Sequence, residues 1–100
     1  MKRWTVYLLR CGDGSLYTGI TNRLAARMAA HRAGKGGRYT RSRLPVVLAW
    51  CKRGQAPGDA RRLEAALKRL RPTDKARLAA GDAGLWRRLR RTTLGTASGR

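Results

Sequence analysis

The sequence predicts an α+β fold, in which helices pack against a small antiparallel sheet. Residues 3–10 form a run rich in β-branched and aromatic side chains, and a second short run follows at 16–20. A third run, VVLAWC at 46–51, is apolar and β-branched. The segments between and after these runs carry apolar residues at helical spacing. We expect the order β-β-α-β-α, followed by short helices.

The chain suits one compact domain. It has 100 residues and a hydrophobic content of 42%, and a chain of this size buries enough surface for a single core. We expect the domain to span residues 1–91 and the remainder, 92–100, to form a flexible tail.

The first two runs read as a β-hairpin. The segment CGDGS between them contains Gly12, Asp13 and Gly14, residue types that tolerate the positive φ of a tight or bulged turn. If these three residues form the loop, paired strand positions sum to an even number. Tyr7 and Tyr17 then point to the same face of the sheet.

The segment after the hairpin predicts a helix. Thr21 or Asn22 can cap a helix that begins near Arg23 and stops at the sequence AGKGG. On this helix Arg23, Arg27 and His31 share one ridge, because they are spaced four residues apart. The basic segment at 35–43, KGGRYTRSR, has two glycines and no apolar period. We expect a mobile loop there, suited to a phosphate backbone.

Three further helices are expected after a loop at 54–58. Asp59 is a good cap for the first, which Pro72 would end. Thr73 would cap a second over 74–80, and Asp82 would start a third. The two cysteines, Cys11 and Cys51, are too few for a zinc site with one histidine available. We interpret them as reduced core residues.

The charge makes nucleic acid the expected partner. Lys and Arg number 24 against 5 Asp and Glu, a formal net charge of +19, and such a chain binds polyanions by neutralising phosphates. Arginine predominates, which suits bidentate phosphate contacts, although a compositional bias of the source genome would give the same excess. No apolar run approaches the length of a spanning helix or a signal peptide. We therefore expect a soluble, cytoplasmic protein without a membrane partner.

Five residues together resemble a known family. Tyr7 in TVY, Tyr17 in YTG, Arg27, His31, and Glu64 in ARRLEAALK stand in the order and spacing of the markers of the GIY-YIG nuclease superfamily. Chain length and the LYTGIT string are most similar to its small stand-alone bacterial, YhbQ-like members. The resemblance implies a three-stranded antiparallel β-sheet flanked by helices. It also implies an endonuclease that hydrolyses DNA phosphodiester bonds in repair or processing, by in-line attack of water.

The resemblance also implies roles for these residues. Glu64 would be the protein ligand of one divalent metal ion, Mg²⁺ or Mn²⁺, and Arg27 would stabilise phosphoryl charge. Tyr7, Tyr17 and His31 would orient or deprotonate the water. A hard carboxylate suits Mg²⁺, which keeps most of its waters. We expect the remaining nucleic-acid contacts to come from the basic ridge and loop: Arg23, Arg32, Lys35, Arg38, Tyr39, Arg41 and Arg43.

Other interpretations stay open. The chain could be a non-catalytic nucleic-acid-binding module that uses its basic surface, or an accessory protein that binds structured RNA by charge. Glu64 and Lys68 form a favourable i, i+4 pair, which alone would explain the glutamate. Recognition of a substrate would come from DNA shape, from the basic loop, or from a partner protein.

Overall fold

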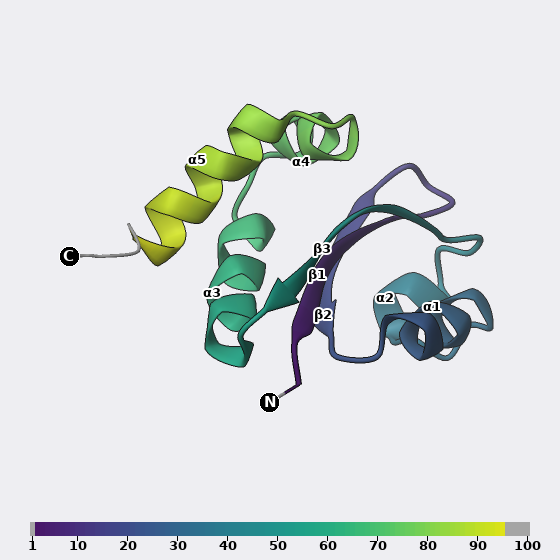
Figure 1. Cartoon of the computed structure of the whole chain (residues 1–100). Coiled ribbons are helices and arrows are strands. Elements are labelled where there is room, and N and C mark those ends of the chain that lie inside the picture. Colours follow the sequence, from purple (N-terminus) through teal and green to yellow (C-terminus); the bar gives the residue numbers. More distant parts are fainter. Residues whose placement is uncertain (1, 96–100) are drawn as a thin grey trace.

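The structure, a computed structural model, describes residues 2–95 and contains a three-stranded antiparallel sheet between two layers of helices (Figure 1). The strands are β1 (Trp4–Arg10), β2 (Leu16–Thr21) and β3 (Val47–Gln55), in the spatial order β2-β1-β3. The predicted α+β class and sheet are confirmed. β3 is longer than predicted, because it continues through Gly54, which takes a φ of +80° where the pairing with β1 shifts register.

The β1–β2 hairpin has the predicted register. Pairs run from Thr5 opposite Thr21 to Arg10 opposite Leu16, so each pair of positions has an even sum. The loop is closed by hydrogen bonds of 2.9 Å from the Cys11 amide to the Ser15 carbonyl and from the Gly14 amide to the Cys11 carbonyl. Tyr7 lies opposite Gly19, and Tyr17 lies opposite Leu9. The expectation that both tyrosines share one face is therefore confirmed.

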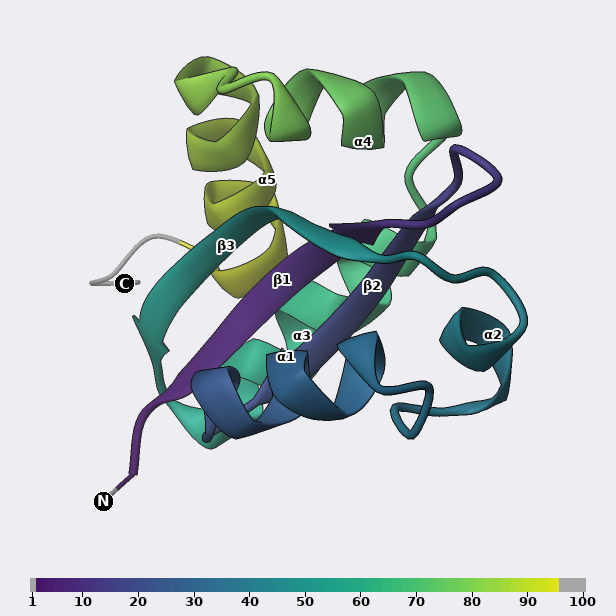
Figure 2. The same cartoon turned by 90° about the vertical axis from the view of Figure 1, so that its right-hand side faces the viewer.

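Each face of the sheet has its own apolar core. On one face, Val6 and Leu8 pack with Leu63 and Leu67 of α3 (Pro57–Lys68). The helices α4 (Pro72–Ala79) and α5 (Ala83–Leu94) extend this layer. On the other face, Tyr7, Leu9 and Cys11 pack with Met28 of α1 (Leu24–Arg32). Figure 2 shows α1 in front of the sheet and α3 behind it.

Two predictions for the segment between β2 and β3 are wrong in part. Neither Thr21 nor Asn22 occupies the N-cap of α1: Arg23 does, without a side-chain cap, while the Thr21 Oγ1 accepts a hydrogen bond of 3.0 Å from the Arg23 amide. The basic segment at 35–43 is not wholly a loop. A short helix, α2 (Arg38–Arg41), forms within it, because tertiary contacts described below hold its side chains.

The C-terminal helices start at prolines. α3 begins at Pro57 instead of being capped by Asp59, and α4 begins at Pro72 instead of after Thr73. The fixed φ of proline suits the first helical position, where its missing N–H is not needed. Asp82 caps α5 as predicted, accepting a hydrogen bond of 2.9 Å from the Leu85 amide.

α5 runs to Leu94, beyond position 92, where the sequence predicts the tail to begin. The rest of the predicted tail, at 96–100, lies outside the described residues. Within residues 2–95, no helix combines the length and the apolar character needed to cross a membrane.

Candidate active site

A buried chain of three hydrogen-bonding side chains lies between the sheet and α1. The hydroxyl of Tyr7, on the central strand, is 3.0 Å from Nε2 of His31. Nδ1 of the same ring is 3.0 Å from Oγ1 of Thr40 on α2. All three residues are at most 1% exposed. The Tyr7 and Thr40 hydroxyls can each donate or accept, so a neutral imidazole in either tautomer satisfies both contacts.

Two glycines make room for this chain. A Cβ atom at Gly19 would overlap the Tyr7 hydroxyl, and one at Gly36 would overlap the imidazole ring of His31. Gly19 lies directly opposite Tyr7 in the hairpin register. Side chains at these two positions would displace the two rings, so the glycines are part of the construction of the site.

Arg27 lies one helical turn before His31 on the same ridge of α1 and is half-buried. Its Nη2 donates a hydrogen bond of 2.7 Å to the Gly36 carbonyl, which ties α1 to the glycine segment that follows it. Burial is the main cause of a raised pKa at Tyr7, and the Arg27 guanidinium opposes that rise. Burial and then the Arg27 charge lower the pKa of His31, which favours the neutral imidazole.

Glu64 approaches from the other layer. It lies on α3, which packs against the face of the sheet opposite α1. Its side chain is 25% exposed and pairs with Lys68 at 3.4 Å. The Glu64 carboxylate is nevertheless among the groups that raise the pKa of Tyr7. Glu64 and Arg27 therefore shift the pKa of the same phenol in opposite directions, from two layers of the fold.

Tyr17 links the buried chain to the surface. It is half-buried, and its ring meets His31 edge-on with 5.7 Å between the centroids. Its other neighbour is Tyr39 of α2, whose ring stacks on it at 5.6 Å. The Arg43 guanidinium carbon lies 3.7 Å from the centre of the Tyr39 ring. The Tyr39 ring thus contacts both an aromatic ring and a cation.

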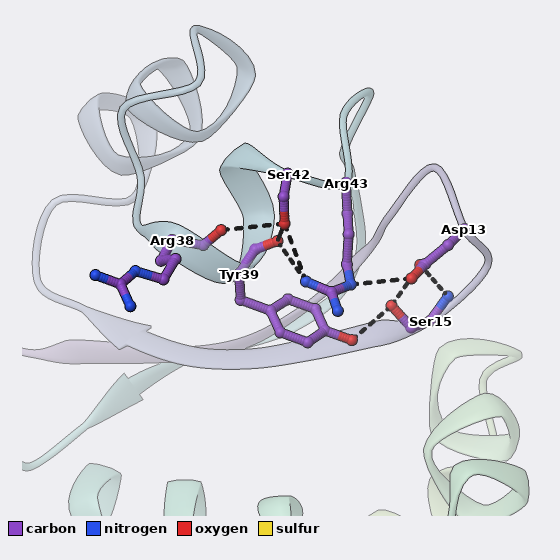
Figure 3. A network of polar contacts seen from close by, with 6 residues as sticks. All are labelled: Asp13, Ser15, Arg38, Tyr39, Ser42 and Arg43. Atoms are coloured by element: carbon purple, nitrogen blue, oxygen red, sulfur yellow. Dashed lines mark hydrogen bonds and ion pairs between the residues drawn. The ribbon is translucent and has the colours of Figure 1, made fainter.

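Polar contacts fasten the same segment to the hairpin turn (Figure 3). The Tyr39 hydroxyl donates to Ser15 Oγ at 2.8 Å, and Ser15 Oγ donates to Asp13 at 2.6 Å. Arg43 Nε donates to Asp13 at 3.0 Å. Two residues expected to contact nucleic acid, Tyr39 and Arg43, are therefore already engaged within the chain. This network explains why α2 is ordered.

The remaining basic residues of the expected nucleic-acid surface are exposed: Arg23, Arg32, Lys35, Arg38 and Arg41. A shallow groove of about 300 Å³ runs beside α1. Thr21, Asn22, Arg23 and Arg27 are among the residues that line it. A phosphate in this groove would meet the half-buried guanidinium of Arg27 as well as the exposed one of Arg23.

The donor set suits only one kind of metal ion. Within residues 2–95, no group of three or more His, Cys, Asp or Glu side chains comes together, so a zinc site has no ligands here. Glu64 is a single, partly exposed carboxylate. Such a group fits a hard cation of the Mg²⁺ type, which keeps most of its water ligands.

Comparison with known proteins assigns the family. Residues 3–77 match the GIY-YIG catalytic domain. The chain belongs to the GIY-YIG family. The resemblance inferred from the five markers is thereby confirmed, and with it a nuclease-like domain. The GIY-YIG match includes Tyr7, Tyr17, Arg27, His31 and Glu64, and it ends within α4.

Relatives of this GIY-YIG chain include proteins named UPF0213. One from Nitratidesulfovibrio vulgaris is 49% identical over 72 residues, which are 72% of this chain but 64% of that protein. One from Streptococcus sanguinis is 47% identical over 74 residues, covering 74% of this chain and 83% of its own length. The solution NMR structure of a UPF0213 protein from Bacillus halodurans matches 94% of this chain and 98% of its own, with 35% identity and a TM-score of 0.53.

Sequence reasoning missed two residues of the site. Thr40 lies in the segment interpreted as a phosphate-contacting loop, but it binds His31. Gly36 reads as a loop residue, but it accepts from Arg27 and lies against the imidazole. The two closely spaced glycines, Gly36 and Gly37, were the available signal, because glycine also marks close approach of a side chain to the backbone.

Proposed function

We propose that the protein is a metal-dependent endonuclease that hydrolyses phosphodiester bonds of DNA by in-line attack of water, in DNA repair or processing. One observation carries the proposal: the hydroxyl of the buried Tyr7 is 3.0 Å from Nε2 of His31. The charges of Arg27 and Glu64 both affect the pKa of this hydroxyl. A proton acceptor, a fixed cation and a carboxylate are the groups that this chemistry uses.

Tyr7 and His31 would move the proton. His31 has no exposed surface and Tyr7 is only 1% exposed. His31 would therefore act through its hydrogen bond to Tyr7, and the water would have to reach the Tyr7 hydroxyl inside the site. The water gives a proton to the Tyr7 oxygen as the Tyr7 proton passes to His31 Nε2, and the resulting hydroxide attacks phosphorus. Burial lowers the pKa of His31, which keeps Nε2 free to accept. Nε2 can accept when Nδ1–H donates to Thr40, whose hydroxyl would also hold the ring in position.

Arg27 and Glu64 would stabilise the phosphoryl charge. A guanidinium stays charged at all relevant pH values and can bind two phosphoryl oxygens, so Arg27 stabilises the charge that develops in the transition state. A divalent ion held by Glu64 would supply Lewis acidity to the same group. Both side chains are half-buried, so each keeps some accessible surface at which a phosphate could contact it.

A non-catalytic nucleic-acid-binding module is the second candidate, because Glu64 does form its helical ion pair with Lys68. If that pair is the whole role of the carboxylate, its loss costs only about 0.3–0.5 kcal/mol of stability and no activity exists to lose. The two functions therefore differ in what removal of the Glu64 charge does.

The deciding substitution is Glu64→Gln, which preserves size and removes the charge. We expect Mg²⁺-dependent nicking of supercoiled DNA to fall by about 10³-fold or more, because a metal ligand contributes several kcal/mol to the transition state. DNA affinity without metal should persist. The matched control is Asp59→Asn on the same helix, which also removes one negative charge from an exposed pair and should leave nicking unchanged.

Single-turnover nicking, metal-free DNA affinity and melting temperature are measured for all three proteins. Equal nicking by wild type and Glu64→Gln would contradict the metal-ligand role. A wild-type protein that binds DNA but nicks none, with Mg²⁺ or Mn²⁺, would establish the binding module instead.

A further inference from the structure

A cleft of about 300 Å³ opens at the end of the hairpin. Figure 2 shows the β1–β2 turn beside the beginning of α4. Its lining includes Arg10, Ser15 and Tyr39 on one side and Pro72 and Lys75 on the other. None of the four residues proposed for the chemistry lines it. The cleft is therefore a separate feature that the proposed reaction does not use.

The cleft concentrates positive charge without a carboxylate to balance it. Asp13, on the adjoining turn, pairs with Arg43, and Asp74, beside Lys75 in sequence, pairs with Arg77. Among residues 2–95, neither Arg10 nor Lys75 has an ion-pair partner. Burial, and then repulsion by Lys68, lower the pKa of Lys75. A half-buried cation of this kind is stabilised when an anion binds beside it.

The geometry favours a phosphate over a base as the occupant. The Tyr39 ring already contacts the Tyr17 ring and the Arg43 guanidinium, so a stacked base would have to compete with these contacts. The Tyr39 and Ser15 hydroxyls already donate their hydrogens within the turn network. What the cleft still offers is the charge of Arg10 and Lys75, which is what a phosphate group requires.

We propose that Arg10 and Lys75 form a second phosphate site, which binds a backbone phosphodiester of the nucleic acid some nucleotides from the scissile one. β2 is an edge strand that leads from the cleft to the Tyr7 hydroxyl. Ser15 and Gly19 are about 13 Å apart along it, at roughly 3.3 Å per residue. A strand of nucleic acid along this edge reaches both places. The inference rests on the proposed function, because that function places the scissile phosphate at the Tyr7 hydroxyl.

The test uses the salt dependence of binding, measured by fluorescence anisotropy on the wild-type chain without divalent metal. The probe is a single-stranded oligonucleotide without terminal phosphates. For single strands, log K falls with log salt by about 0.7 per neutralised phosphate. We expect Arg10→Gln and Lys75→Gln each to reduce the slope by up to about 0.7. The double variant should reduce the slope no further, because both residues contact the same phosphate.

Arg90→Gln is the control, since Arg90 is exposed on α5 and lines no part of the cleft. It removes the same charge and should leave the slope unchanged. Melting temperatures identify any variant that fails to fold. NMR titrations follow the amides of Gly14, Ser15 and Lys75 with the same oligonucleotide, with its 5′-phosphorylated form, and with inorganic phosphate.

Shifts of these amides with the unphosphorylated oligonucleotide support the proposal. Shifts only with the 5′-phosphorylated form or with inorganic phosphate would overturn it in favour of a terminal or free phosphate. A wild-type slope in the double variant would also overturn it. These readouts need no cleavage, so they are independent of the Glu64→Gln result. If that variant nicks normally while the cleft binds, the proposed chemistry fails and the second site stands.

Discussion

His31 shows how one buried side chain can depend on a residue far away in the sequence. Its ring has a partner on each nitrogen, Tyr7 at one end and Thr40 at the other, and no exposed surface. A buried polar group that loses its hydrogen-bond partner still carries the full cost of desolvation. A buried hydroxyl that has no partner can be replaced by an apolar group without this loss. Thr40 and Thr18 represent these two cases, because the buried Thr18 Oγ1 makes no hydrogen bond.

Thr40→Val should therefore lower the free energy of unfolding by about 1–3 kcal/mol, since the His31 Nδ1 loses its buried partner. Thr18→Val, the matched control, should be neutral or stabilising, because it removes an unsatisfied hydroxyl. Urea unfolding of both variants measures the difference. Equal destabilisation would mean that the Thr40 hydroxyl does not support the ring.

Helix α2 shows how a short element can be held by tertiary contacts. Four residues with no side-chain cap do not form a stable helix by themselves. The contacts of the Tyr39 ring with Tyr17 and Arg43 supply the missing stability, and its hydroxyl reaches the hairpin turn. Because Thr40 follows Tyr39 directly, docking of the ring also positions the hydroxyl that binds His31.

Tyr39→Ala should lower the free energy of unfolding by about 1–3 kcal/mol, because it removes a stacked aromatic pair and a cation–π contact. Amide hydrogen exchange over 38–43 should accelerate, because the helix loses its anchor. Tyr39→Phe keeps the ring and serves as the control, with slower exchange than Tyr39→Ala. If exchange in the alanine variant matches wild type, the stack does not hold α2.

At the scale of the whole molecule, charge dominates. The formal net charge is +19, and within residues 2–95 every carboxylate side chain already forms an ion pair. The remaining cations repel one another, which opposes the compact state. The same cations attract nucleic acid by neutralising its phosphates. Added salt screens both effects at once.

Salt should therefore act in opposite directions on stability and on binding. Between about 50 mM and 200 mM NaCl, affinity for duplex DNA should fall by about 10³-fold or more if six or more phosphates are contacted, while the melting temperature rises. Anisotropy and thermal unfolding over one salt series measure the two. A nearly flat dependence of affinity on salt would rule out a phosphate-tracking surface.

Local patterns were enough to predict the three strands, the hairpin register and the cap at Asp82. Strand and turn signals depend on neighbouring residues, and the even sum of paired positions follows from a three-residue loop. The shared face of Tyr7 and Tyr17 follows from the same arithmetic. The family resemblance, carried by five residues in order, was also readable from the chain alone.

Only the tertiary structure decided which of these residues touch. Tyr7 and His31 are 24 positions apart, as are Ser15 and Tyr39, and no periodicity relates them. Thr40, Gly36 and α2 were missed because their partners belong to other elements. The cleft holding Arg10 and Lys75 was missed for the same reason. Local propensity determines the elements, but long-range contacts form only when the layers pack against each other.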